Sequence, residues 1–218
     1  ILVLTGGSPI TTPELEELAD AILFAWYPGQ QGGAAVADVI FGEHNPSGRL
    51  PITFPMSVDK LPPYEDYSME GRTYKYMTDK PWYPFGYGLS FTSFEYAKPE
   101  LSSSSIKSGD ALEVTVKVRN QGETDGREIV QLYITSEDAE FDVPQSSLIG
   151  FKPVEIAAGA EKSVTFTMKP EQMDVFDAEG KRQRIRGRYT LHAGGVSPGE
   201  RGEELTGSPL QTVEFSVK

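Results

Sequence analysis

The sequence contains no cysteine. This absence excludes a disulfide framework, a thiolate-ligated zinc or iron–sulfur site, and a thiol nucleophile. Basic residues are also scarce, because 20 Lys+Arg stand against 32 Asp+Glu and give a formal net charge of −12. Dividing the chain after Ser90 leaves both parts net negative, so no basic domain is hidden in either. We therefore expect no nucleic-acid partner, since binding to phosphates needs clustered Lys and Arg.

Long apolar runs are missing as well. None approaches the roughly 18–20 residues of a membrane span, and no positively charged leader precedes Ile1. We therefore expect no membrane partner. The chain opens directly on the apolar run Ile1–Leu4, which is typical of a strand buried on both faces. This opening indicates a chain cut from a longer one, whose first strand needs a partner from elsewhere.

The first 56 residues are typical of an open α/β sheet. After the strand at 1–4, Thr12 and Pro13 predict a helix N-terminus, with Thr12 as its cap. The apolar run 21–26 predicts a second strand, and residues 30–41 predict a second helix that ends before Gly42. Strand and helix alternate here as they do in α/β domains, so we expect residues 1–56 to be part of an α/β sandwich domain.

The remaining chain divides into a connector and an all-β domain. Residues 57–90 carry many aromatic rings between Pro and Gly, which predicts an ordered connector that packs between its neighbours. Residues 91–218 show the alternation of β-strands, for example at 112–118, 129–134, 164–168, 189–193 and 213–217. About seven such strands predict a β-sandwich of immunoglobulin or fibronectin type III kind, and the lack of cysteine favours the second.

No stretch carries a strong signature of catalysis. Gly29–Gly33 lacks both phosphate-loop spacings and is typical of a strand-to-helix turn. His44 and His192 lie far apart with no Glu/His pair at helical spacing, and the acids at 137–142 lack the EF-hand pattern. Glu65, Asp66 and Glu70 are close in sequence, whereas a glycosidase needs two carboxylates on opposite sides of a sugar. We expect neither a cofactor nor a metal.

Several segments resemble glycoside hydrolase family 3, in its three-domain β-glucosidase and β-xylosidase type. They occur in the family's order and span nearly the whole chain. The matching segments are 25–33, 41–51, 66–74, 82–90, 148–151 and 186–191.

The resemblance implies a (β/α)₈ barrel, then an α/β sandwich domain, then a fibronectin type III-like domain, of which this chain has only the last parts. The family's nucleophile is an aspartate of the barrel, and its acid/base is a glutamate upstream of the strand that Ile1–Leu4 matches. No residue of this chain is therefore expected to be catalytic. The implied enzyme removes sugars from non-reducing ends with retention, and the isolated chain is expected to be inactive.

The same resemblance implies partners and a location. Expected partners are the missing N-terminal part of the enzyme or a neighbouring copy, as in a homodimer, together with a β-linked oligosaccharide substrate. A periplasmic or secreted location is implied, with the cytoplasm as the alternative. The rival functions are a non-catalytic carbohydrate- or protein-binding module, for which exposed connector rings would count, and a purely structural role.

One segment is a candidate for contact with substrate. By the resemblance, Glu70, Arg72, Tyr74 and Tyr76 would lie at the rim of the sugar pocket. Aromatic faces stack on sugar rings, and guanidinium groups donate to hydroxyls. The alternative is that Arg72 pairs with Glu70 or Asp66 inside the connector.

Overall fold

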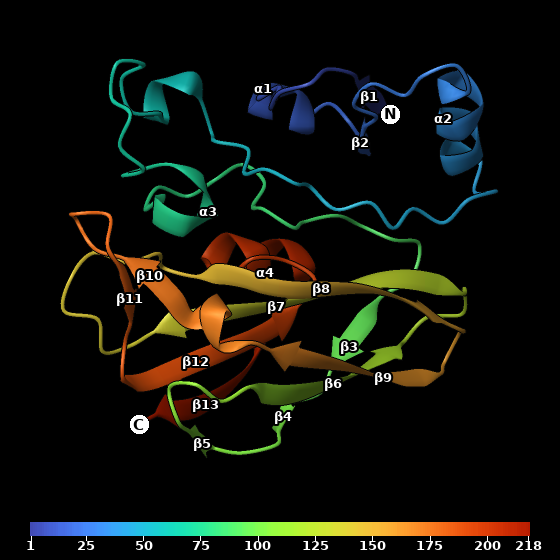
Figure 1. The fold of residues 1–218 in the computed structure, drawn as a ribbon. Coiled ribbons are helices and arrows are strands. Elements are labelled where there is room, and N and C mark those ends of the chain that lie inside the picture. Colours follow the sequence, from blue (N-terminus) through green and yellow to red (C-terminus); the bar gives the residue numbers. More distant parts are fainter.

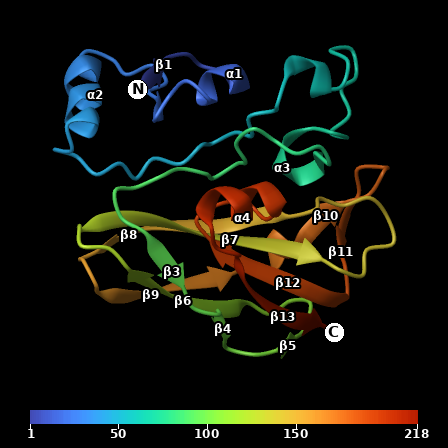
Figure 2. The same cartoon turned by 180° about the vertical axis from the view of Figure 1, so that it is seen from behind.

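The computed structural model describes residues 1–218. It shows a small α/β part lying above a larger β-sandwich, with the connector running between them (Figure 1). The view from behind shows the same arrangement, with a short helix, α4 (Glu200–Thr206), between the connector and the sandwich (Figure 2). None of the helices is both long enough and apolar enough to span a membrane.

The α/β part contains the two predicted strands, which pair in parallel. Strand β1 (Leu2–Leu4) lies beside β2 (Ile22–Phe24), with helix α1 (Pro13–Glu16) between them in sequence and α2 (Gly32–Ile40) after them. Within this chain β1 is not buried on both faces, because Val3 of this strand is 37% exposed, and the preceding Ile1 is 64% exposed. The apolar pattern therefore predicted the strand correctly, and its cover is not supplied by these residues.

Thr12 occupies the predicted N-cap position of α1, but its side chain does not cap the helix. Thr12 has φ −140° and ψ 61° and makes no capping hydrogen bond, although Pro13 does occupy the first turn. The Thr12 hydroxyl is instead buried without a hydrogen-bond partner. The helix is one turn long, and Pro13 supplies its starting φ without needing a cap.

The connector is irregular but ordered. It contains a 3₁₀ turn, η1 (Val58–Lys60), and a single helical turn, α3 (Thr73–Tyr76). An isolated antiparallel bridge joins Phe54 to Tyr83 and folds the connector back on the segment that precedes it. Its rings are divided between two environments, since Trp82 is 1% exposed whereas Tyr64 is 86% exposed.

The sandwich consists of two antiparallel sheets with one short parallel edge. The first sheet has the order β5-β13-β12-β7-β8, and the second has β3-β6-β4, with β9 also paired to β6. The first sheet is made of β5 (Ser105–Ile106), β7 (Gly126–Ser136), β8 (Ser147–Ile156), β12 (Gly187–Gly194) and β13 (Gln211–Val217). The second is made of β3 (Phe94–Tyr96), β4 (Glu100–Leu101), β6 (Leu112–Asn120) and β9 (Glu161–Met168). A separate hairpin, β10 (Asp174–Phe176) with β11 (Arg182–Arg184), follows the 3₁₀ turn η2 (Pro170–Met173).

The core lies between these two sheets and follows the alternation of the sequence. On β6, Leu112, Val114, Val116 and Val118 are fully buried, whereas the residues between them face outward. Strand β7 differs, because it is buried on both faces. Val130, Leu132 and Ile134 enter the core, and Gln131 and Tyr133 on the other face are covered by the connector. This double cover explains why residues 129–134 include no charged side chain.

Candidate functional site

The Arg72 side chain fixes a loop of the connector by donating hydrogen bonds to main-chain carbonyls of that loop. Its Nε donates to the Ser68 carbonyl at 3.1 Å, and its Nη2 donates to the carbonyls of Pro63 at 3.1 Å and Asp66 at 2.6 Å. The guanidinium group therefore holds the ends of the 63–68 loop together. The hydrogen bond from the Ser68 amide lowers the pKa of the Asp66 carboxyl, and the charge of the nearby Arg72 guanidinium lowers it further.

The side chains of the other three predicted rim residues make no hydrogen bond to the Arg72 guanidinium, which donates only to carbonyls. Glu70 is exposed. Tyr74 stacks on Phe85 with ring centroids 4.4 Å apart, and its hydroxyl accepts a hydrogen bond from the Leu148 amide at 3.1 Å. Tyr76 is half-buried, and burial raises the pKa of its hydroxyl, as it does for Tyr74. Tyr74 thus anchors the connector to strand β8, whereas Arg72 shapes the loop before it.

The junction between connector and sandwich is polar and specific. The Gln131 side-chain amide donates to the carbonyls of Gly86 at 3.0 Å and Gly195 at 2.7 Å. Tyr133 beside it contacts the rings of Tyr74 and Phe85 edge-on. These contacts hold the connector at one position on the outer face of the first sheet.

A buried ion pair fixes the same junction at its other end. Arg49 Nη2 lies 2.6 Å from Glu128 Oε2, and their side chains are only 10% and 2% exposed. The Tyr96 hydroxyl donates to the second oxygen of Glu128 at 2.7 Å, and burial raises the pKa of Tyr96. Both oxygens of a buried carboxylate are thereby satisfied, which a buried charge requires.

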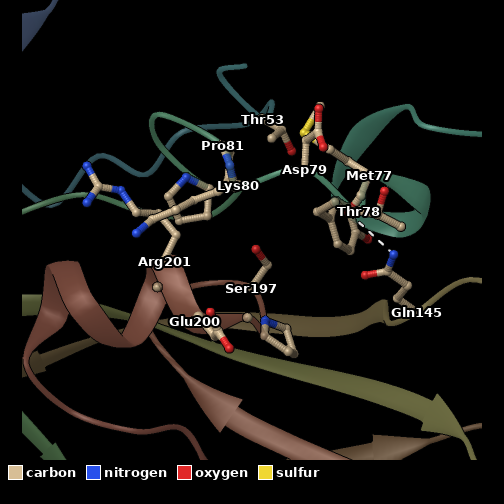
Figure 3. Close-up of a pocket in the computed structure, with 15 residues that line it drawn as sticks. Thr53, Met77, Thr78, Asp79, Lys80, Pro81, Gln145, Ser197, Glu200 and Arg201 are labelled. Atoms are coloured by element: carbon tan, nitrogen blue, oxygen red, sulfur yellow. Dashed lines mark hydrogen bonds between the residues drawn. The ribbon is translucent and has the colours of Figure 1, made fainter. Parts of the chain in front are cut away.

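A cleft lies between the connector and helix α4 (Figure 3). Its volume is about 320 Å³, and Tyr74 is the one predicted rim residue that lines it. Residues on its connector side include Asp79 and Lys80, and residues on its sandwich side include Ser197 and Arg201. No motif predicts this cleft, because Asp79 and Lys80 lie more than a hundred positions before Ser197 and Arg201 in the chain.

The arrangement contains no metal centre, since no three His, Asp or Glu side chains converge. His192 lies on β12 against the Thr135 hydroxyl at 3.0 Å, and burial lowers its pKa. Asp138, in the acidic 137–142 segment, pairs with Arg188 at 3.0 Å. These residues have structural partners and do not form a catalytic constellation.

Known protein families match both parts of the chain. Residues 1–91 match the glycosyl hydrolase family 3 C-terminal domain, and residues 128–197 match the fibronectin type III-like domain. Fold and matches together define the C-terminal region of a multidomain glycoside hydrolase.

Relatives in sequence and structure agree with this class. A xylan 1,4-β-xylosidase of Xylanibacter ruminicola is 42% identical over 88% of this chain and 22% of its own length. A periplasmic β-glucosidase of Salmonella typhimurium is 35% identical over 89% of this chain and 27% of its own. A solved β-glucosidase of Erythrobacter marinus is 38% identical and superposes with a TM-score of 0.83 over 99% of this chain and 28% of its own.

The chain belongs to glycoside hydrolase family 3, as the end of its α/β sandwich domain followed by a fibronectin type III-like domain. It spans about a quarter of the length of these relatives, from 22% to 28%. This C-terminal portion does not include the catalytic domain.

Proposed function

We propose that the chain is the C-terminal portion of a retaining, exo-acting β-glycosidase that acts on β-glucosides or β-xylosides. The observation that carries the proposal is the match over 99% of this chain to a solved β-glucosidase at 38% identity. In such an enzyme the 1–56 segment completes the domain that presents the acid/base, and the sandwich braces it. The bracing is supported by the Arg49–Glu128 pair and by the hydrogen bonds from Gln131 to the connector.

The test compares three purified proteins on aryl β-glucosides and aryl β-xylosides. The separate 218-residue chain is expected to give no turnover above background, because removal of catalytic carboxylates costs many orders of magnitude in rate. The full-length protein is expected to hydrolyse at least one of the two substrates, and the same protein truncated before Ile1 is expected to lose that activity. Turnover by the separate chain that disappears on one Asp or Glu substitution within it would contradict the proposal.

We also propose that the functional partners are the N-terminal part of the enzyme, a β-linked oligosaccharide, and a second copy in a homodimer. A periplasmic or secreted location is supported by the periplasmic β-glucosidase of Salmonella typhimurium. The proposed domain limits are 1–56, 57–90 and 91–218, and limited proteolysis with mass spectrometry tests them. Size-exclusion chromatography with light scattering tests the dimer.

The segment with Glu70, Arg72, Tyr74 and Tyr76 is proposed to border the sugar pocket in the full-length enzyme. What supports this is the loop that Arg72 closes, because it holds the rings of Tyr64 and Tyr67 in solvent at 86% and 87% exposure. Arg72 would then act as a positioning residue, since its own donors are engaged by carbonyls.

Kinetics of the full-length enzyme test this border. Arg72→Ala should raise KM for disaccharides while leaving turnover of small aryl glucosides largely intact, because the terminal-sugar site lies elsewhere. The matched control is Arg188→Ala, which breaks an exposed ion pair on the sandwich. Equal effects of Arg72→Ala on both substrate classes, with a lowered melting temperature, would assign Arg72 to structure alone.

A binding module that uses the connector rings has little support left. Trp82 is buried, and Tyr74, Phe85 and Tyr83 pack against other rings, so most connector rings are not available to a ligand. Binding of the separate chain to insoluble cellulose or xylan, abolished by Tyr67→Ala, would restore it.

A further inference from the structure

Two hollows on the connector adjoin each other. The 320 Å³ cleft of Figure 3 shares Asp79, Lys80 and Arg201 with a second hollow of about 440 Å³. The second hollow extends over Trp82 to Glu16 of helix α1. We refer to the two together as the connector groove. The volume of each hollow lies within the range of small-molecule sites.

The walls of the groove carry balanced charge. Two of the fifteen residues that line the first hollow are hydrophobic, so an apolar ligand is disfavoured. The ionisable groups are three carboxylates and three cations. They are Glu16, Asp79 and Glu200 against Lys60, Lys80 and Arg201. A phosphate or another strongly charged ligand would meet as much repulsion as attraction here.

The cations of the groove are also engaged already. Lys80 lies 2.6 Å from Glu204, and Arg201 donates to the Trp82 carbonyl at 3.1 Å and pairs with Glu204 at 3.3 Å. Their positive charge is therefore neutralised by the protein. What the walls offer a ligand is mainly hydrogen bonding to uncharged groups.

Hydroxyl groups of the lining have unused hydrogen-bonding capacity. Ser197 is 2% exposed and uses its amide on the Phe85 carbonyl at 2.9 Å, whereas its hydroxyl bonds to no group of the protein. The Thr53 hydroxyl is buried at the opposite wall without any partner. An unpaired buried hydroxyl is costly, so a ligand that pairs with both groups gains affinity.

We propose that the connector groove binds a short, uncharged oligosaccharide through hydrogen bonds to Ser197, Thr53 and the Glu200 carboxylate. A sugar fits because it offers donors and acceptors around its whole edge and carries no charge. The two adjoining hollows accommodate more than one sugar unit. The inference rests on the lining of the groove and not on the proposed hydrolytic function, so the two can fail separately.

The experiment is an NMR titration of the ¹⁵N-labelled 218-residue chain with glucose, cellotetraose and xylotetraose. We expect saturable shifts of the Ser197 and Glu200 amides, with a Kd of about 1–10 mM for the single sugar. A tetrasaccharide that fills both hollows is expected to bind about tenfold tighter. Glycerol and inorganic phosphate at equal concentration serve as probes for unspecific polyol and anion binding.

Two variants and one control complete the test. Ser197→Ala and Thr53→Val should each weaken binding about three- to tenfold, the value of one hydrogen bond. Thr53→Val should not lower stability, because the hydroxyl that it removes has no partner. Thr212→Val, at an exposed position of β13, should leave binding unchanged.

The outcomes separate clearly. Shifts confined to the groove and weakened by both variants support the proposal. It is overturned by the absence of saturable shifts up to 100 mM sugar, by equal shifts with glycerol or phosphate, or by shifts elsewhere that neither variant changes. If a variant alters the spectrum throughout, the other variant decides, and the same pair is compared by calorimetry in the full-length protein.

Discussion

Removal of the Trp82 side chain should loosen the contact between the α/β part and the connector. The indole lies 4.6 Å from the Tyr83 ring and 6.4 Å from the Phe54 ring, centroid to centroid. Its N–H donates to the Glu16 carboxylate on helix α1 at 2.6 Å. One side chain therefore joins a helix, a bridge segment and the connector across 66 positions of sequence.

The magnitude follows from burial and from the hydrogen bond. A side chain that is 1% exposed has no room to relax outward, so Trp82→Ala should cost about 3–5 kcal/mol. Trp82→Phe keeps most of the ring but removes a hydrogen bond to a charged group. This smaller change should cost about 1.5–3 kcal/mol.

Urea unfolding measures both values. Trp26 remains as the fluorescent reporter of the α/β part in either variant, because it packs 4.5 Å from Phe24. Circular dichroism reports the sandwich. With a slope of about 2 kcal/mol per molar urea, Trp82→Ala should lower the Trp26 midpoint by roughly 1.5–2.5 M. The exposed Tyr67→Ala is the control and should change stability by less than about 0.5 kcal/mol.

A loss of less than half a kcal/mol for Trp82→Ala would refute this reasoning. It would mean that the ring is not packed in solution and that the connector is free of the α/β part. A large loss that appears equally for Trp82→Phe would assign the stability to the Glu16 hydrogen bond alone.

Three further predictions concern the sandwich and its junction. Arg49→Ala should cost about 3–5 kcal/mol in urea unfolding, because it leaves a buried carboxylate without its partner; a cost typical of an exposed pair would contradict this. Gly86→Ala should lower stability by more than about 1 kcal/mol, because Gly86 has φ +80° and an added Cβ would collide with Gln131 Oε1. The control Gly109→Ala should not lower stability in this way, because no atom lies near the position of its added Cβ. Burial lowers the pKa of His192 in the folded state. The stability that its neutral form contributes is therefore complete above pH about 6.5 and is lost as the pH falls through the folded-state pKa. Melting temperatures measured between pH 5 and 7.5 should show this loss, and His192→Gln should reduce it.

Periodicity predicted the interior strands because their environment is simple. On β6 each apolar side chain enters the core and each polar one faces solvent, so the alternation is uninterrupted. Strand β8 was not predicted as a strand from periodicity, because it lies at a sheet edge. Gly150 and Lys152 interrupt its core-facing side, where both lie against Phe166.

Helix α4 was not predicted either, because its sequence lacks a regular apolar pattern. Its residues Glu200–Thr206 are mostly charged, and only Gly202 is buried, so no apolar spacing marks it. The connector groove could not be predicted either, because Thr53 and Ser197 are brought together by the fold and belong to no common sequence motif. The contacts of Arg72 with main-chain carbonyls could also not be predicted, because they leave no trace in residue identities.

Strand β7, with the core on one face and the connector on the other, limits how this domain can be exchanged. A sandwich cut out after Ser90 and grafted onto another protein would keep its core but leave Tyr133 and Gln131 bare. Recombination would therefore have to carry the connector along with the sandwich, or replace both residues at once. The unit that can be exchanged therefore begins inside the connector, ahead of Tyr74. A transplanted sandwich that lacks this part of the connector should aggregate through its uncovered sheet.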